Sequence, residues 1–116
     1  MKRGEIWTVD LNPGFGREVR KKRPALIISP DIYNKQLFTI VTVPFSSQVP
    51  RLITPEMVLV APDKINNLEK KSVLLPVFIK AVDKSRFIKK VGKLTEAKLA
   101  EVEYALKIVL GLESLV

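Results

Sequence analysis

Two clusters of basic side chains are the chemical feature that stands out in this sequence. They comprise Arg17, Arg20, Lys21, Lys22 and Arg23, and then Lys80, Lys84, Arg86, Lys89, Lys90 and Lys93. The chain carries 20 Lys and Arg against 12 Asp and Glu over 116 residues, a formal net charge of +8. Residues 94–116 have a net charge of −2, so residues 1–93 carry +10. This distribution favours a polyanionic partner, although clustered charges also occur on surfaces that serve only solubility.

The residue types that are absent exclude several kinds of catalysis. The chain has no Cys and no His, so thiol nucleophiles, disulfides, zinc-thiolate sites and Ser-His-Asp triads are impossible. Proton transfer is left to carboxylates, Lys, Arg, Tyr or water. The four Asp residues are scattered and show no metal-ligand spacing, and no nucleotide-binding motif is present. We therefore expect no metal and no cofactor.

The length and the hydropathy pattern indicate one soluble domain. A core of useful size can form in 116 residues without disulfides. Residues 1–5 lead directly into alternating sequence without an apolar segment, so no secretory signal is expected. No apolar run approaches the roughly 18 residues of a membrane span. We expect a cytoplasmic protein consisting of a single domain, residues 1–116.

The elements that must position these basic residues are mostly short strands. Apolar and β-branched residues predict strands at 6–11, 24–29, 38–43, 57–60, 72–75 and 86–91. Residues 30–34 are compatible with one helical turn, and residues 61–71 with a loop or a short helix. Many short strands separated by turn signals favour a small antiparallel barrel, closed or half-open.

The C-terminal region changes to a helical period. Leu99, Val102, Leu106 and Val109 recur at helical spacing, so they predict a helix of about four turns that packs on the core. Thr95 is a suitable N-cap, and Gly111 is a plausible end.

Four blocks of sequence, in order and at fitting spacing, resemble the MazF/PemK/Kid toxins, the ribonuclease components of bacterial toxin–antitoxin pairs. They are residues 2–13 (KRGEIWTVDLNP), residues 16–29 with Gly-x-Glu and Arg-Pro motifs, residues 43–48 (VPFSSQ), and residues 72–95, which lead into the final helix. Together these blocks cover nearly the whole chain.

The resemblance implies an SH3-like antiparallel β-barrel with a C-terminal α-helix, assembled as a homodimer. It implies sequence-specific, metal-independent cleavage of single-stranded RNA, inhibition by an antitoxin with an acidic, flexible tail, and DNA binding by the toxin–antitoxin complex. Metal-free cleavage has a natural route, because RNA supplies its own nucleophile in the 2′-hydroxyl next to the scissile phosphate. The products are then a 2′,3′-cyclic phosphate and a 5′-hydroxyl.

The resemblance assigns catalytic roles to Arg23, Ser46 and Glu18. Arg23 matches the family's Arg-Pro motif, and a guanidinium can hold two phosphate oxygens at once. Ser46 matches a catalytic Thr and keeps its hydroxyl. Glu18 matches the Gly-x-Glu motif, and it could either pair with Arg23 or act as a general base. A surface ion pair is the alternative interpretation of Glu18.

Further residues are candidates for binding RNA. Phe78 stands where many family members have Gln, so it could stack on a base or point inward. The candidates are Phe15, Arg17, Arg20, Lys21, Lys22, Ser47, Gln48, Phe78 and Lys80. Two other functions remain open: an RNA-binding module without catalysis, and a toxin-fold protein that acts on a protein target such as a topoisomerase.

Overall fold

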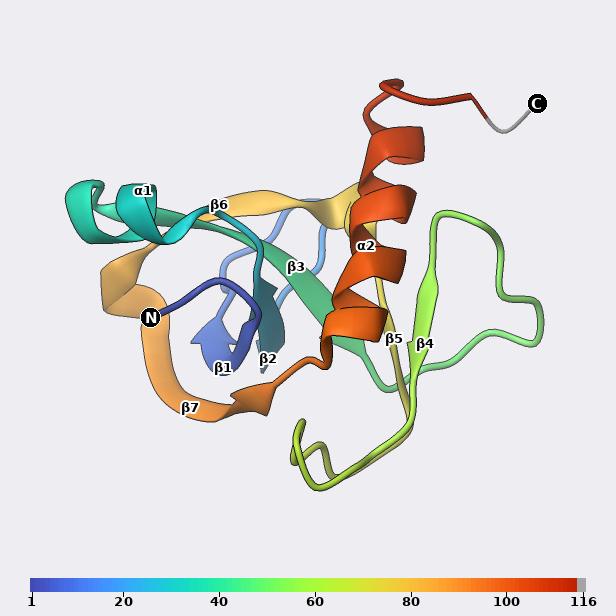
Figure 1. Cartoon of the computed structure of the whole chain (residues 1–116). Helices are drawn as coiled ribbons and strands as arrows, with labels where there is room; N and C mark the ends of the chain where they lie inside the picture. The colour runs from blue at the N-terminus through green and yellow to red at the C-terminus, as the bar shows by residue number, and fades with distance from the viewer. Residues whose placement is uncertain (115–116) are drawn as a thin grey trace.

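The computed structural model describes residues 1–114, which form one antiparallel sheet and a long C-terminal helix (Figure 1). The strands are β1 (Glu5–Asp10), β2 (Lys22–Ile27), β3 (Thr39–Ser46), β4 (Val58–Val60), β5 (Ser72–Leu74), β6 (Lys80–Asp83) and β7 (Phe87–Lys93). The α-helices are α1 (Asp31–Gln36) and α2 (Glu96–Val109), and two single 3-10 turns are η1 (Pro76–Phe78) and η2 (Lys84–Arg86). This is the expected class, mainly β with a C-terminal helix.

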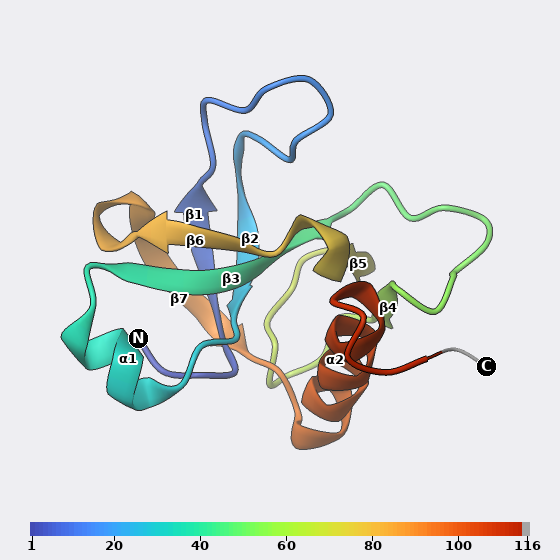
Figure 2. The ribbon, with the colours of Figure 1, turned by 90° about the horizontal axis from the view of Figure 1, so that it is seen from above.

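The sheet follows the order β4-β5-β3-β2-β1-β7, with β6 paired to β3 outside this path. One edge of β3 pairs with β2, while its other edge pairs first with β6 and then with β5. Figure 2 shows β3 and β6 crossing above the β1–β2 pair. Because β4 and β7 do not pair with each other, the sheet curves without closing, which agrees with the half-open form of the expected barrel.

Helix α2 covers one face of the sheet and completes the main core. Val102, Ala105 and Leu106 are buried against strand residues such as Phe45 and Leu74. The Thr95 hydroxyl accepts a hydrogen bond from the Lys98 N–H at 3.3 Å, which confirms the predicted N-cap. Gly111, at a φ of +72°, ends the helix where a left-handed backbone favours glycine.

Two β-bulges interrupt the pairing between β1 and β7. The pairing register shifts between Ile6 and Trp7, and again between Thr8 and Val9. The residues that the pairing skips, Val91 and Ile88, belong to β7, so β1 keeps its alternation, and Ile6 and Val9 are buried on opposite faces. Ile6 joins the main core, and Val9 joins a small second core.

Strand β6 and the segment 61–71 are the two parts of the fold that the sequence patterns do not specify. Strand β6 was not predicted, because only Val82 of its four residues is buried and the segment lacks an apolar pattern. Residues 61–71 form a loop rather than a helix. Asn66 organises this loop: its amide donates to the Ala61 carbonyl at 2.9 Å, and its side-chain oxygen accepts from the Leu68 N–H at 2.9 Å.

The loop 61–71 packs directly on β7. A side chain at Gly92 would lie 2.4 Å from the Asn66 carbonyl oxygen, so only glycine permits this approach. The Lys93 N–H donates to the Ile65 carbonyl at 3.1 Å, and the Asn67 amide donates to the Val91 carbonyl at 3.1 Å. This contact fixes the loop beside β2 and β3, where it forms part of a cavity wall.

Candidate active site

Arg23 lies on β2, and its guanidinium is held by backbone carbonyls. Its Nε donates to the Arg20 carbonyl at 2.8 Å and its Nη1 donates to the Phe45 carbonyl at 3.2 Å. Partial burial lowers the pKa of Arg23 from its usual value, but a guanidinium still keeps its charge at neutral pH. Of its five N–H donors, three remain available to a ligand. Arg23 is therefore a fixed cation with free donors.

Ser46 ends β3 beside this guanidinium. The β2–β3 register pairs Ala25 with Pro44, and two further residues along the same antiparallel register bring Arg23 opposite Ser46. The residue before Ser46 is Phe45, whose carbonyl receives the Arg23 hydrogen bond. The Ser46 hydroxyl accepts from the Gln48 N–H at 3.2 Å and is half-buried, so its own proton is free to be donated.

Arg23 and Ser46 line one cavity of about 740 Å³, which we call the Arg23 cavity. Its other polar residues come from β1, the β1–β2 loop, β2, the segment after β3, the loop 61–71, β5 and β7: Thr8, Lys21, Lys22, Ser47, Gln48, Asn67, Glu69, Lys70, Ser72, Lys89 and Lys90. Five lysines and one arginine face a single carboxylate among these residues, so the cavity is strongly positive.

Several of these residues were missed as site residues from the sequence. Lys89 and Lys90 belong to the second basic cluster, but nothing in the sequence indicated that β7 pairs with β1 and brings them to the same cavity as Arg23. Asn67, Glu69 and Lys70 reach the cavity because their loop packs on Gly92. The signal available was weak: a glycine in a strand can mark the close approach of another segment.

Glu18 does not lie in the Arg23 cavity. It lines a second cavity of about 260 Å³, which we call the Phe78 cavity, together with Leu11, Val19, Thr42, Pro44, Val77, Phe78, Ile79 and Lys80. Its Oε1 accepts from the Phe15 N–H at 2.6 Å. Within residues 1–114 it forms no ion pair with Arg23, so the suggested pairing is wrong. The physical reason is that the Glu18 carboxylate accepts a hydrogen bond from within the β1–β2 loop and stabilises the turn of this loop.

Phe15, Arg17 and Arg20 project from the β1–β2 loop. This loop is anchored at its base, where the Leu11 N–H donates to the Lys21 carbonyl at 3.0 Å and the Lys21 N–H donates to the Asn12 side chain at 2.9 Å. The Phe15 side chain is 82% exposed. An exposed aromatic ring beside basic residues can stack on a base, so this loop is a suitable extension of either cavity.

The comparisons with known proteins decide the family. The model of the PemK-like, MazF-like toxins of type II toxin–antitoxin systems matches residues 2–110. The chain belongs to this family. "Endoribonuclease MazF" from Staphylococcus saprophyticus is 33% identical over 99% of this chain and 95% of its own length. The protein of the same name from Staphylococcus epidermidis is 34% identical over 98% of this chain and 94% of its own length.

Solved structures of MazF proteins share the fold. MazF from Deinococcus radiodurans superposes with a TM-score of 0.83 at 27% identity, covering 96% of each chain. An endoribonuclease from a mycobacterial species, solved in complex with its cognate antitoxin, gives a TM-score of 0.80 at 24% identity over 98% of each chain, a likeness that concerns the fold. As a member of the MazF-like family, the chain is an endoribonuclease toxin of a toxin–antitoxin system.

Two further observations concern the part of the chain that the structure describes. No helix within residues 1–114 is long and apolar enough to cross a membrane. No group of three or more Asp or Glu side chains gathers in a way that could hold a metal ion.

Proposed function

We propose that this chain cleaves single-stranded RNA at a short sequence by attack of the RNA's own 2′-hydroxyl on the adjacent phosphate, without a metal ion. The products would carry a 2′,3′-cyclic phosphate and a 5′-hydroxyl. The observation that carries the proposal is the position of Arg23 and Ser46 on the walls of one cationic cavity. A phosphate held there would contact both groups, and lysines from the start of β2, the loop 61–71 and β7 would hold the flanking backbone.

Arg23 and Ser46 have distinct roles in this reaction. As the 2′-oxygen attacks, negative charge gathers on the non-bridging oxygens, and the free N–H donors of Arg23 stabilise that charge. Because two backbone carbonyls hold the guanidinium, little reorganisation is needed during the reaction. The Ser46 hydroxyl donates a hydrogen bond to a phosphate oxygen or orients the 2′-hydroxyl.

The proton transfers need a base and an acid, and two carboxylates are candidates. Glu18 is favoured by its place in the Gly-x-Glu motif. Glu69 is favoured by its position, because it is the carboxylate among the residues that line the Arg23 cavity. Both remain to be tested.

The remaining candidates bind RNA or a partner. Lys21, Lys22, Ser47 and Gln48 line the Arg23 cavity, where they would hold phosphates and bases. Phe15, Phe78, Arg17, Arg20 and Lys80 would extend this contact. We further propose that the toxin acts in the cytoplasm as a homodimer, and that an antitoxin with an acidic tail inhibits it by occupying this positive surface.

A cleavage assay with EDTA present tests the proposal. We expect the wild-type protein to cut single-stranded RNA under these conditions and Arg23→Ala to lose this activity. An RNA with 2′-deoxyribose at the cleavage position should bind and remain intact. Mass spectrometry of the products should find the cyclic phosphate. Binding without cleavage by the wild type would favour a non-catalytic RNA-binding module, and no effect on RNA at all would favour a protein target.

A further inference from the structure

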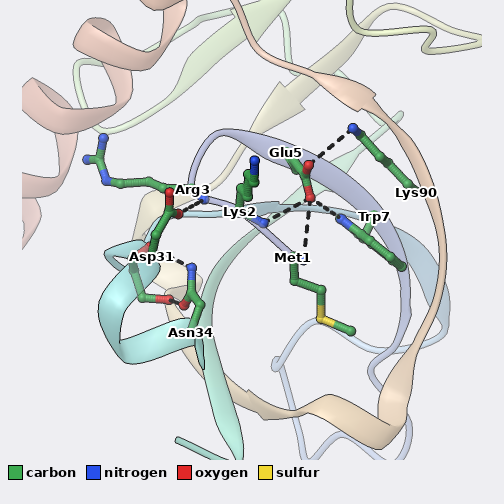
Figure 3. A network of polar contacts seen from close by, with 9 residues as sticks. Met1, Lys2, Arg3, Glu5, Trp7, Asp31, Asn34 and Lys90 are labelled. Carbon is green, nitrogen blue, oxygen red and sulfur yellow. Dashed lines mark hydrogen bonds and ion pairs between the residues drawn. The ribbon is translucent and has the colours of Figure 1, made fainter. Parts of the chain in front are cut away.

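Lys90 occupies an unusual place among the lysines of the Arg23 cavity. Its ammonium lies 3.1 Å from Oε2 of Glu5 (Figure 3). Its side chain is 50% exposed and lines the cavity. The other cavity lysines are Lys21, Lys22, Lys70 and Lys89, and within residues 1–114 none of them forms an ion pair. Lys90 is therefore the cavity lysine whose position the protein fixes.

A β-bulge produces this arrangement. Ile6 pairs with Gly92, but Trp7 pairs with Lys90, so the register skips Val91. Without the bulge, Lys90 would lie opposite Thr8. The bulge places it opposite Trp7 instead, beside the face of β1 that carries Glu5 and Trp7. Bulges commonly redirect a side chain next to a functional site.

Glu5 is itself rigidly held. Its side chain is only 13% exposed. Oε1 accepts hydrogen bonds from the Trp7 indole at 2.9 Å and from the Lys2 N–H at 2.9 Å. Trp7 in turn packs edge-on against Phe87, with 6.2 Å between the ring centres. The N-terminal ammonium of Met1 lies 3.9 Å from the same oxygen, Oε1. With Oε1 held in this way, the carboxylate presents its other oxygen to Lys90 in a defined direction (Figure 3).

We propose that Glu5 is a positioning residue for RNA cleavage, which acts by holding the Lys90 ammonium at the wall of the Arg23 cavity, where it contacts a phosphate of the bound RNA. This inference rests on the proposed nuclease function and adds a residue that lies outside the cavity. Of the three N–H donors of Lys90, one is directed to Glu5 and the others are free for phosphate oxygens.

The pairing has opposite consequences for binding and for turnover. Glu5 compensates the charge of Lys90, so it weakens the general attraction for RNA. The same ion pair holds the Lys90 ammonium in one place, where it can fix the position of the bound phosphate relative to Arg23 and Ser46. Loss of the Glu5 charge should therefore make RNA bind more tightly and react more slowly.

Glu5→Gln separates this role from a structural one. A Gln oxygen can still accept from the Trp7 indole and the Lys2 N–H, so this substitution mainly removes the charge that faces Lys90 at 3.1 Å and, at 3.9 Å, the N-terminal ammonium of Met1. Glu103→Gln is the matched control, because Glu103 forms a 2.6 Å ion pair with Arg3 and does not line the Arg23 cavity. Lys90→Met and the double variant with both substitutions complete a double-mutant cycle, which measures the coupling between Glu5 and Lys90.

We expect Glu5→Gln to lower the single-turnover cleavage rate at saturating RNA about tenfold. Affinity for a 2′-deoxy-substituted, uncleavable RNA should rise about twofold to threefold, and the salt slope should steepen by about 0.7, one additional counterion for a single strand. In the Lys90→Met background, Glu5→Gln should produce no further loss of rate. Glu103→Gln should leave rate and affinity unchanged.

The contrary outcomes distinguish a failure of the positioning role from a failure of the nuclease proposal. An unchanged rate for Glu5→Gln, or a rate and affinity that fall together with the melting temperature, overturns the positioning role. A further loss of rate in the Lys90→Met background also overturns it. If the wild-type protein itself does not cleave RNA, the nuclease proposal has failed instead. Binding and melting measurements do not depend on cleavage, so the two failures can be distinguished.

Discussion

The Arg23 cavity and the Phe78 cavity are lined in part by neighbouring residues of β3, but the chemistry of their side chains differs. Strand β3 contributes Phe45 and Ser46 to the first and Thr42 and Pro44 to the second. The Arg23 cavity is about 740 Å³ and strongly cationic, whereas the Phe78 cavity is about 260 Å³ and combines apolar residues such as Val19, Phe78 and Ile79 with Glu18, Thr42 and Lys80. The first is suited to stabilising charge on a phosphate, and the second to binding an apolar surface such as the face of a base.

This difference divides the residues that the family resemblance had grouped into one site. Arg23, Ser46 and the residues after Ser46 lie in the Arg23 cavity, while Glu18, Phe78 and Lys80 lie in the Phe78 cavity. Substitutions in the Arg23 cavity should therefore affect the rate of cleavage. Substitutions in the Phe78 cavity should mainly affect affinity and base preference.

The largest effect should come from Arg23→Lys. An ammonium cannot make the two backbone hydrogen bonds and still present a planar pair of donors to a phosphate. We expect the cleavage rate to fall about a thousandfold, measured in single-turnover assays. Arg86→Lys is a suitable control, since Arg86 also donates to a backbone carbonyl, that of Asn12 at 2.9 Å, but does not line the Arg23 cavity. Comparable losses in the two variants would contradict the assignment.

Acid should weaken the wall of the Arg23 cavity through Glu5. Burial acts to raise the pKa of Glu5, but hydrogen bonds from Trp7, Lys2 and Lys90 and the charge of Lys90 outweigh it and lower the pKa from 4.5 to about 2. The lowered pKa stabilises the fold above pH 4.5, and this contribution is lost as the pH falls towards 2. Glu5 should account for about 3 kcal/mol of the loss in the free energy of unfolding over this range, as measured by denaturant titrations. In Glu5→Gln the loss over the same range should be smaller by about this amount.

Ser46→Ala should lower the cleavage rate about a hundredfold, because the reacting phosphate loses one hydrogen-bond donor. Ser46→Thr should retain activity, since it keeps the hydroxyl and its methyl group restricts rotation. Single-turnover rates on one RNA would test both variants. If Ser46→Ala is as active as the wild type, the hydroxyl has no part in catalysis.

The two carboxylates offer a direct test of the division between the cavities. If the Arg23 cavity performs the chemistry, Glu69→Gln should lower the single-turnover rate more than Glu18→Gln, by about tenfold. A larger loss in Glu18→Gln would mean that the Phe78 cavity contributes to catalysis. That result would favour Glu18, which the Gly-x-Glu motif indicates, over Glu69, which lines the Arg23 cavity.

The smallest effect should come from Phe78→Ala. If Phe78 stacks on a base, its removal should weaken RNA affinity about fivefold, corresponding to about 1 kcal/mol, with an unchanged rate at saturation. Phe38→Ala is the matched control, since Phe38 is exposed and lines neither cavity. Binding isotherms on RNAs that differ at single positions would show whether base preference changes. Equal affinity for Phe78→Ala and the wild type would indicate that the ring has only a packing role.

Local patterns in the sequence determined much of the fold. Thr95, the apolar stripe through Val102 and Leu106, and Gly111 specify α2, because caps and helical periodicity act within a few residues. The strands with strong apolar character were predicted for the same reason. Arg23 and Ser46 could be chosen from motif positions, and the structure brings them together.

Only the tertiary structure decided which other side chains join them. Lys90 reaches Glu5 through a bulge, and Glu69 reaches the cavity because Gly92 lets a loop approach β7. Glu18 lies apart from Arg23, although only four residues separate them in the chain. Strand pairing and bulges join segments that are distant in sequence, and the energy that selects them comes from packing across the sheet, which no local pattern contains.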